Sequence, residues 1–558
     1  MSGLGTVFPI LQPPPTVNTT LRAAASGHLC NIRVILLGDL KIHTSWLFVM
    51  KKFLCTLFLL GIPLVAIAEL AELEQWLENE RQRWEIPGMA VAVVHRDEIV
   101  LARGFGQTRL SNGRPVDADT QFGIASLSKA MTTTSLALLV DEGKLDWDDR
   151  VVDHLPAFEL SDPWVTAEVR IRDLLSHRVG VGRLFGNRLT FMPTASREEF
   201  MARLRHHEFE QPFRQGYVYS NAMFTVAGAV LEAISGETWE DFLESRLFAP
   251  LGMTRSNTRI DSLDENAVWP HQEIEGELVE IARRDWRYAG PAASVNASIH
   301  DLARWMRFNL GDAGKLDGER LIEPDTMARL HQPANLVGFD EDEMGINAYG
   351  LGWGIGRYQG FHVLRHGGAT DGINTQVWLV PELELGIVIS ANRFTHLRQP
   401  VMQRVVDHFA EFEPTEWGES ELEKFVQERE QAREARLDVH QSRHQGTTTT
   451  HELSAYLGIY EHPLYDRVEV IKSESALSLR FWNDDSQMAD LEHWHFDTFR
   501  AHWHNPAQRE KFVWFGLSKD GQPDELNVHF TLRPRLLEEG VYPADYTRVV
   551  RFVRQQSE

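Results

Sequence analysis

The spacing of apolar residues predicts one helix and two strands up to residue 102, then helices up to residue 310, and then strands up to residue 391. Helical patterns cover residues 70–84, 126–142, 225–234, 239–247 and 299–310. Patterns of short buried strands cover residues 88–94, 98–102, 360–366, 375–380 and 385–391. Strands from both ends would share one sheet around a helical middle. We therefore expect an α/β (α+β) fold, with an antiparallel sheet of roughly five or more strands flanked by helices and a helical lobe.

The composition changes after residue 411. Up to residue 450 the chain is rich in Glu, Gln and Arg, and Ser420 and Glu423 have the spacing of a capping box. This pattern predicts a charged helical linker over residues 413–450. Short alternating segments then follow, at residues 467–471, 476–482, 511–517 and 526–530. Such segments, separated by turn residues, predict a small all-β domain over residues 451–558, either a barrel or a sandwich.

The amino-terminal part has the layout of a secretory signal over residues 50–68. Met50 is followed by two lysines, a mostly apolar run, and the small-residue site Ala66-Ile67-Ala68. Residues 1–49 fit no targeting scheme, so we expect an over-extended start, with translation beginning at Met50. The alternative is a long native leader that inserts as an anchor. The first interpretation predicts a periplasmic or secreted protein with no stable membrane anchor after cleavage.

The cysteines and the net charge exclude several classes of function. Both cysteines, Cys30 and Cys55, precede the predicted cleavage site, so the mature chain would have neither a disulfide nor a catalytic thiol. Residues 1–68 carry five basic and one acidic side chain, and their removal takes the net charge from −24 to −28. Such an acidic surface repels nucleic acid and anionic lipid.

A Ser-x-x-Lys spacing is the first candidate for chemistry. Ser126 opens a predicted helix, and Lys129, three residues later, falls on the same face. A serine hydroxyl is a weak nucleophile and needs a base within hydrogen-bond reach. Of all the lysines in the chain, only Lys129 has a serine or threonine three places before it. Burial beside an apolar helix would lower the lysine pKa toward neutrality, where the amine can accept a proton.

Two further motifs are weak when taken alone. Tyr219-Ser220-Asn221 lies in a predicted polar turn just before an apolar helix. A tyrosine there can pass protons and an asparagine can hold a substrate amide, although a loop tyrosine that packs its ring is the plainer interpretation. His366-Gly367-Gly368-Ala369 follows a predicted strand, where two glycines would let a substrate backbone lie against the sheet edge.

Together and in this order, the three motifs resemble those of the serine β-lactamase and penicillin-binding-protein family. Their spacing is most similar to the branch that holds class C β-lactamases, D-aminopeptidases and esterases. The resemblance extends over roughly residues 70 to 400 and predicts a catalytic domain at 69–412. It includes four further stretches, at residues 139–147, 174–180, 250–254 and 349–354. The carboxy-terminal segment resembles, more modestly, a small β-barrel domain often appended to such hydrolases.

The resemblance implies roles for the motif residues. Ser126 would be acylated, Lys129 would take its proton, and Tyr219 would relay a proton to the leaving group and later activate water. Asn221 would hold the substrate amide, and the backbone N–H groups of Ser126 and Ala369 would bind the oxyanion. No metal or organic cofactor is needed for this chemistry.

One departure from the family pattern bears on the substrate. His366-Gly367-Gly368 stands where β-lactamases carry Lys-Thr-Gly, so the permanent positive charge and the hydroxyl that hold a substrate carboxylate are missing. We therefore expect an exported hydrolase of small esters or D-amino-acid peptides. The alternatives are a β-lactamase or D-Ala-D-Ala carboxypeptidase, and a catalytically silent protein that binds cell-wall peptides. Any carboxylate binding should strengthen as His366 protonates below about pH 6.5.

Four histidines in the carboxy-terminal domain raise the question of a metal site. They alternate along two predicted strands, so each pair would point to one face: His493, His495, His502 and His504. Their neighbours include two tryptophans and a phenylalanine, and we favour packing among these rings over metal binding.

Overall fold

The computed structural model describes residues 70–182, 196–340, 345–413, 415–473, 476–508, 511–531 and 547–555. Residues 1–68 lie outside the described part of the chain. The over-extended start, the signal peptide and the removal of both cysteines therefore stay predictions. None of the helices in the described part of the chain is long and apolar enough to cross a membrane.

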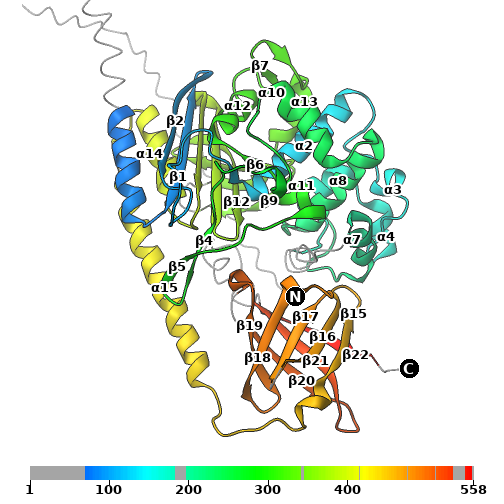
Figure 1. Ribbon diagram of the computed structural model, residues 1–558. Coiled ribbons are helices and arrows are strands. Elements are labelled where there is room, and N and C mark those ends of the chain that lie inside the picture. Colours follow the sequence, from blue (N-terminus) through cyan, green and yellow to red (C-terminus); the bar gives the residue numbers. More distant parts are fainter. Residues whose placement is uncertain are drawn as a thin grey trace, which may run out of the picture. The chain divides into compact units, whose positions relative to one another are not determined.

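An eight-stranded antiparallel sheet forms the centre of the catalytic part (Figure 1). Its strands, in spatial order, are β2 (Glu98–Gly106), β1 (Gly88–His95), β14 (Leu385–Ala391), β13 (Ile373–Val380), β12 (Phe361–Thr370), β11 (Gly354–Tyr358), β10 (Gly345–Tyr349) and β9 (Asn335–Asp340). Strand β1 pairs with β14, with Val91 opposite Ile389. The prediction that strands from both ends share one sheet is confirmed.

Both faces of this sheet are buried at its central strands β1, β13 and β14, and β1 shows why. Met89, Val91 and Val93 pack into one apolar cluster, which also contains residues of helix 70–83 and of α14 (Arg398–Phe409). Ala90 and Ala92 face the opposite cluster, which contains the helices of the middle of the chain. Side chains that alternate along a strand bury both faces only when helices cover both. An uninterrupted apolar run such as 88–94 is the sequence signature of that arrangement.

The helices of the middle region lie on one side of the sheet (Figure 1). They are α2 (Ser128–Asp141), α3 (Val151–His154), α4 (Pro163–Glu168), α5 (Ile171–Leu175), α7 (Arg197–Arg203), α8 (Asn221–Ser235), α9 (Trp239–Leu243), α10 (Ala249–Leu251), α11 (Gly290–Ala293), α12 (Ile299–Asn309) and α13 (Pro324–His331). Helix α8 begins four residues before the predicted start at Thr225, because Ser220 caps it by accepting a hydrogen bond from the Met223 N–H at 3.3 Å.

The predicted linker contains one long helix, α15 (Trp417–Gln441). The predicted capping box was wrong, because the helix already begins at Trp417 and Ser420 lies inside its first turn. The Trp417 indole N–H donates to Asp407 of α14 at 2.8 Å and fixes the start of the helix. Arg436 then reaches Glu275 at 3.3 Å, in the turn between β4 (His271–Ile274) and β5 (Glu277–Glu280).

The carboxy-terminal domain is a closed eight-stranded barrel, which decides between the two predicted all-β forms. Its strands are β15 (Gly458–His462), β16 (Asp466–Ser473), β17 (Ala476–Phe481), β18 (Met488–His495), β19 (Thr498–Trp503), β20 (Lys511–Leu517), β21 (Pro523–Thr531) and β22 (Thr547–Arg554). His502 and His504 pair with Glu492 and Asp490 across the β18–β19 ladder, at 3.0 and 3.1 Å. Among the described residues no group of three or more His, Cys, Asp or Glu could hold a metal ion.

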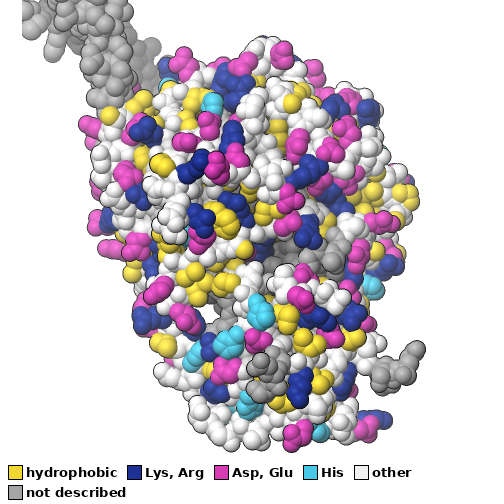
Figure 2. Space-filling model, in the orientation of Figure 1, with side chains coloured by type: hydrophobic (Ala, Val, Ile, Leu, Met, Phe, Trp, Pro, Cys, Tyr) yellow, Lys and Arg dark blue, Asp and Glu magenta, His cyan; other side chains and the backbone are white. Residues whose placement is uncertain are grey.

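The surface carries many charges of both signs. On the face drawn in Figure 2, acidic and basic side chains are interspersed. Ion pairs among the described residues include Arg307 with Asp97 at 2.9 Å and Arg304 with Asp317 at 2.8 Å. On the face drawn in Figure 2, the acidic side chains lie among basic ones instead of being gathered in one patch.

Candidate active site

Ser126 lies on a sharp turn between the short strand β3 (Phe122–Gly123) and α2. The residue before it, Ala125, has φ = +47°, a left-handed conformation that a residue with a side chain rarely adopts. A short 3₁₀ turn, Ala125–Leu127, precedes α2, so the regular helix starts two residues later than predicted. Strained turns of this kind are frequent at active sites, and this one leaves Ser126 partly exposed at the start of the helix.

Lys129 is completely buried beneath Ser126. Its Nζ lies 3.0 Å from Ser126 Oγ, 2.7 Å from Asn221 Oδ1 and 2.9 Å from the Ala292 carbonyl oxygen. The two carbonyl oxygens can only accept hydrogen bonds, so they take two of the amine protons. In the neutral amine the remaining position is a lone pair, and it faces the Ser126 hydroxyl. The geometry thus presents Lys129 as a proton acceptor for Ser126.

Tyr219 and Asn221 reach the same point from the start of α8. The Tyr219 hydroxyl donates to Ser126 Oγ at 2.8 Å, while Asn221 contacts the lysine amine. Asn221 is the first residue of α8, not part of a turn before it, so a regular helix fixes its side chain. Ser126, Lys129, Tyr219 and Asn221 therefore lie together, as the family resemblance implied.

The third motif departs from the prediction. We expected His366 and the glycines to follow the end of a strand, but β12 continues to Thr370 and the whole motif is in the ladder. Gly368 has no room for a side chain. A Cβ at this residue would lie 1.9 Å from the Ile124 carbonyl oxygen and 3.2 Å from the Ser126 nitrogen. Strand β12 therefore runs against the nucleophile turn, and only glycine permits this approach.

His366 is buried and held by Tyr349, for which the sequence predicted no role. The Tyr349 hydroxyl lies 2.8 Å from His366 Nε2, and His366 Nδ1 lies 2.8 Å from the Gly367 carbonyl oxygen. Because the carbonyl only accepts, Nδ1 carries a proton, and Nε2 is held by the tyrosine hydroxyl. Burial raises the pKa of Tyr349 well above its ordinary value, so its phenol stays protonated. Both ring nitrogens of His366 are thus engaged within the protein, which does not favour the expected contact with a carboxylate.

An aromatic cluster supports Tyr219. The His177 ring lies 4.3 Å from the Tyr219 ring and 4.7 Å from the Tyr349 ring, and His177 Nδ1 accepts from the Ser220 N–H at 3.1 Å. His177 and Tyr349 both come from stretches that carried the family resemblance, 174–180 and 349–354, which was the available signal for them. The Ala292 carbonyl had no signal, because any residue provides a backbone oxygen.

Comparison with known proteins agrees with this geometry. The sequence model of the family described as "Beta-lactamase" matches residues 76–410, more than half of the chain. The chain belongs to the beta-lactamase family. A second match, to a domain of unknown function (DUF3471), covers residues 442–539 and so includes most of the barrel.

Proteins similar to this chain come from distant organisms. An unguisins hydrolase of Aspergillus campestris is 28% identical over 420 residues, which are 70% of this chain and 76% of that protein. Protein flp of Staphylococcus aureus is 23% identical over 348 residues, 60% of this chain and 65% of that protein. The fold resembles the octameric penicillin-binding protein homologue from Pyrococcus abyssi, with a TM-score of 0.55 and 18% identity, covering 87% of this chain and 100% of that one. Family and fold together identify a serine hydrolase.

Proposed function

We propose that this serine hydrolase is an exported enzyme that forms an acyl-enzyme on Ser126 and acts on small esters or D-amino-acid peptides. One observation carries the proposal: Ser126 Oγ lies within 3.0 Å of both the Lys129 amine and the Tyr219 hydroxyl. A nucleophile between a base and a proton donor is the arrangement that acyl transfer needs.

The proposed first half of the reaction acylates the serine. Lys129 takes the Ser126 proton while Oγ attacks the substrate carbonyl carbon and the carbonyl oxygen gains the negative charge. The C–N or C–O bond then breaks, and Tyr219 passes a proton to the leaving nitrogen or oxygen. In the second half Tyr219 accepts a proton from water, and the resulting hydroxide attacks the acyl carbon. Lys129 returns the proton to Oγ as the acid leaves.

The oxyanion would be bound by the backbone N–H groups of Ser126 and Ala369. The close contact at Gly368 supports this assignment, because it holds the strand that carries Ala369 against the turn that carries Ser126. Such donors, fixed before the reaction, are worth about 3 kcal/mol each in acyl-transfer enzymes.

The substrate preference follows from His366. An imidazole held by Tyr349 lacks the permanent positive charge that a lysine offers to the carboxylate of a β-lactam or of a D-Ala-D-Ala terminus. This favours substrates without that carboxylate, which are small esters and peptides with a D-amino-terminal residue. β-Lactamase or carboxypeptidase activity is the second candidate because of the family, and silent peptide binding is the third.

Steady-state kinetics on three substrates would test the proposal. We expect p-nitrophenyl acetate or a D-alanyl anilide to have a higher kcat/KM than nitrocefin. Nitrocefin as the best substrate by a wide margin would contradict the assignment of substrate class. If none of the three substrates is turned over but cell-wall peptides bind, the catalytically silent peptide-binding protein is favoured.

A further inference from the structure

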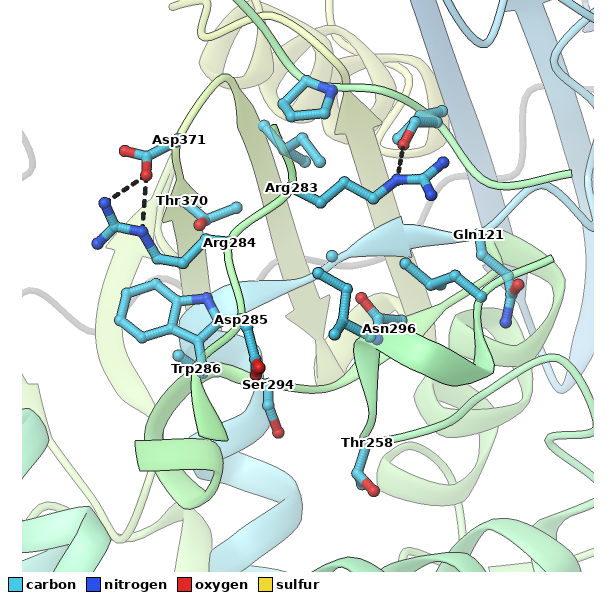
Figure 3. A pocket seen from close by; sticks show the side chains of 17 residues that line it. Gln121, Thr258, Arg283, Arg284, Asp285, Trp286, Ser294, Asn296, Thr370 and Asp371 are labelled. Atoms are coloured by element: carbon cyan, nitrogen blue, oxygen red, sulfur yellow. Dashed lines mark hydrogen bonds and ion pairs between the residues drawn. The ribbon is translucent and has the colours of Figure 1, made fainter. Parts of the chain in front are cut away.

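A cavity lies beside the nucleophile and has no part in the chemistry described so far (Figure 3). Strands β3, β6 (Asn296–Ala297) and β12 border it together with the loop that carries Arg283 to Trp286. Seven of its described lining residues are apolar or aromatic: Ile260, Leu263, Val268, Pro270, Trp286, Ala293 and Ile373.

The position of the cavity relative to Ser126 follows from β12. Thr370 lines the cavity, and a Cβ built on Gly368, two residues earlier, would lie 3.2 Å from the Ser126 nitrogen. Residues two apart in a strand face the same side and lie about 7 Å apart. Gly123, three residues before the nucleophile, also lines the cavity. The cavity therefore opens within reach of a chain of a few carbons attached to Ser126, but beyond the reach of an acetyl group.

The residues that line the cavity are distinct from those around the proton donor. Tyr219, Tyr349 and His366 cluster together, and none of them is among the described residues that line the cavity. A leaving group must receive its proton from Tyr219 and so must lie on the tyrosine side. The acyl part lies on the other side of the bond that breaks, and the cavity near Ser126 offers space for it that is separate from the tyrosine cluster.

The charged residues of the cavity wall are compensated within the protein. Arg284 forms an ion pair with Asp371, and Figure 3 shows their side chains pointing toward one another above Trp286. Asp285 accepts from Arg287 at 2.7 Å, and Arg283 donates to the Val268 and Ala267 carbonyl oxygens. Burial lowers the pKa of Arg284 to about 9, which still leaves it charged at neutral pH. An ionised ligand would have to compete with these contacts, whereas an apolar one would not.

We propose that this cavity binds the acyl chain of the substrate and selects an uncharged aliphatic or aromatic chain, with Trp286 as a specificity-determining residue. The inference rests on the proposed function, because the chain that enters the cavity is the one attached to Ser126 in the acyl-enzyme.

A series of p-nitrophenyl esters tests the inference on the wild-type protein. We expect kcat/KM, corrected for the alkaline hydrolysis rate of each ester, to rise from acetate through butyrate to hexanoate and to be high for phenylacetate. Burial of two methylene groups corresponds to a roughly fifteen-fold rise over acetate. A flat or falling profile would overturn the inference.

Two variants locate the effect. Trp286→Ala removes an apolar wall, and Gly123→Ala adds a methyl group that meets nothing closer than Asn296 Oδ1 at 3.5 Å. Each should reduce the hexanoate-to-acetate ratio at least about threefold. Trp164→Ala is the matched control, because Trp164 lies on α4 and is 64% exposed, and it should leave the ratio unchanged. A hexanoate-to-acetate ratio equal to that of the wild type in all three variants would show that the acyl chain binds outside this cavity.

Boronic acids, which form an adduct with a catalytic serine, test the charge preference without turnover. n-Pentylboronic acid should inhibit at least about tenfold more strongly than 5-boronopentanoic acid. The carboxylate carbon of the second compound is as many bonds from boron as the terminal methyl carbon of the first. Equal or stronger inhibition by the carboxylate would contradict the inference. Loss of all labelling of Ser126 by a fluorophosphonate would overturn the proposed function and this inference together, whereas normal labelling with a flat ester profile would overturn this inference alone.

Discussion

Gly368→Ala is the most informative single change for the architecture of the site. The added Cβ would lie 1.9 Å from the Ile124 carbonyl oxygen, whereas real Cβ contacts essentially never fall under 3.0 Å. The neighbour is backbone and cannot rotate away. Strand β12 and the nucleophile turn must therefore separate by at least about 1 Å, and the proposed oxyanion donors, Ser126 N–H and Ala369 N–H, separate with them.

The magnitude follows from the geometry. A misplacement of about 1 Å can cost 10²-fold in rate, and the loss of one oxyanion donor costs about 10²- to 10³-fold. We therefore expect kcat on p-nitrophenyl acetate to fall by about 10²- to 10³-fold. Overpacking of a close contact should also lower the free energy of unfolding by about 1–3 kcal/mol.

The assay combines ester kinetics with urea unfolding. Gly338→Ala is the matched control, because Gly338 lies on β9 of the same sheet and an added Cβ there meets nothing within 4 Å. The control should keep kcat within about twofold. Retention of kcat within about threefold by folded Gly368→Ala would refute the assignment of the oxyanion site to this strand and turn.

Three further predictions follow. Ser126→Ala and Lys129→Ala should each lower kcat by at least about 10⁴-fold because nucleophile and base act as one unit, and a double variant much slower than either single variant, measured on the same ester, would contradict this. Burial lowers the pKa of His331 to about 4, below the value of about 6.5 in an unfolded chain, so the folded state prefers the neutral ring. This contribution is present above about pH 6.5 and is lost as the pH falls toward 4, so urea unfolding should show up to about 3 kcal/mol less stability at pH 4 than at pH 7, and a smaller loss in His331→Leu. An equal loss in both proteins would refute the role of His331. The exported protein should begin at Glu69, and amino-terminal sequencing that finds residues 1–49 attached would contradict both the start and the cleavage site.

Local patterns predicted much of the fold and the centre of the site. The run at 88–94 was predicted because it is apolar without interruption, and the strands at 375–380 and 385–391 were predicted because apolar and β-branched residues dominate them. The Ser126–Lys129 contact was predicted because three residues make almost one helical turn, and a 3₁₀ turn at Ser126 preserves that proximity.

Contacts between distant segments could not be predicted in this way. The two glycines after His366 indicate a turn when they are considered alone, yet they continue a strand because Gly368 must pass against Ile124, more than 200 residues earlier. Tyr349 reaches His366 across β11, which is a tertiary contact with no sequence period. The capping box at Ser420 failed because the Trp417–Asp407 hydrogen bond starts the helix earlier.

Labelling of the nucleophile tests the central claim most directly. The folded protein is treated with a fluorophosphonate probe, digested, and the labelled peptide is identified by mass spectrometry, with Ser126→Ala and Ser420→Ala treated in parallel. Ser420 is an exposed serine on α15 and serves as the matched control. We predict one label per chain on Ser126 in the wild type and in Ser420→Ala, and none in Ser126→Ala. A label on another serine, or equal labelling of Ser126→Ala, would contradict the account.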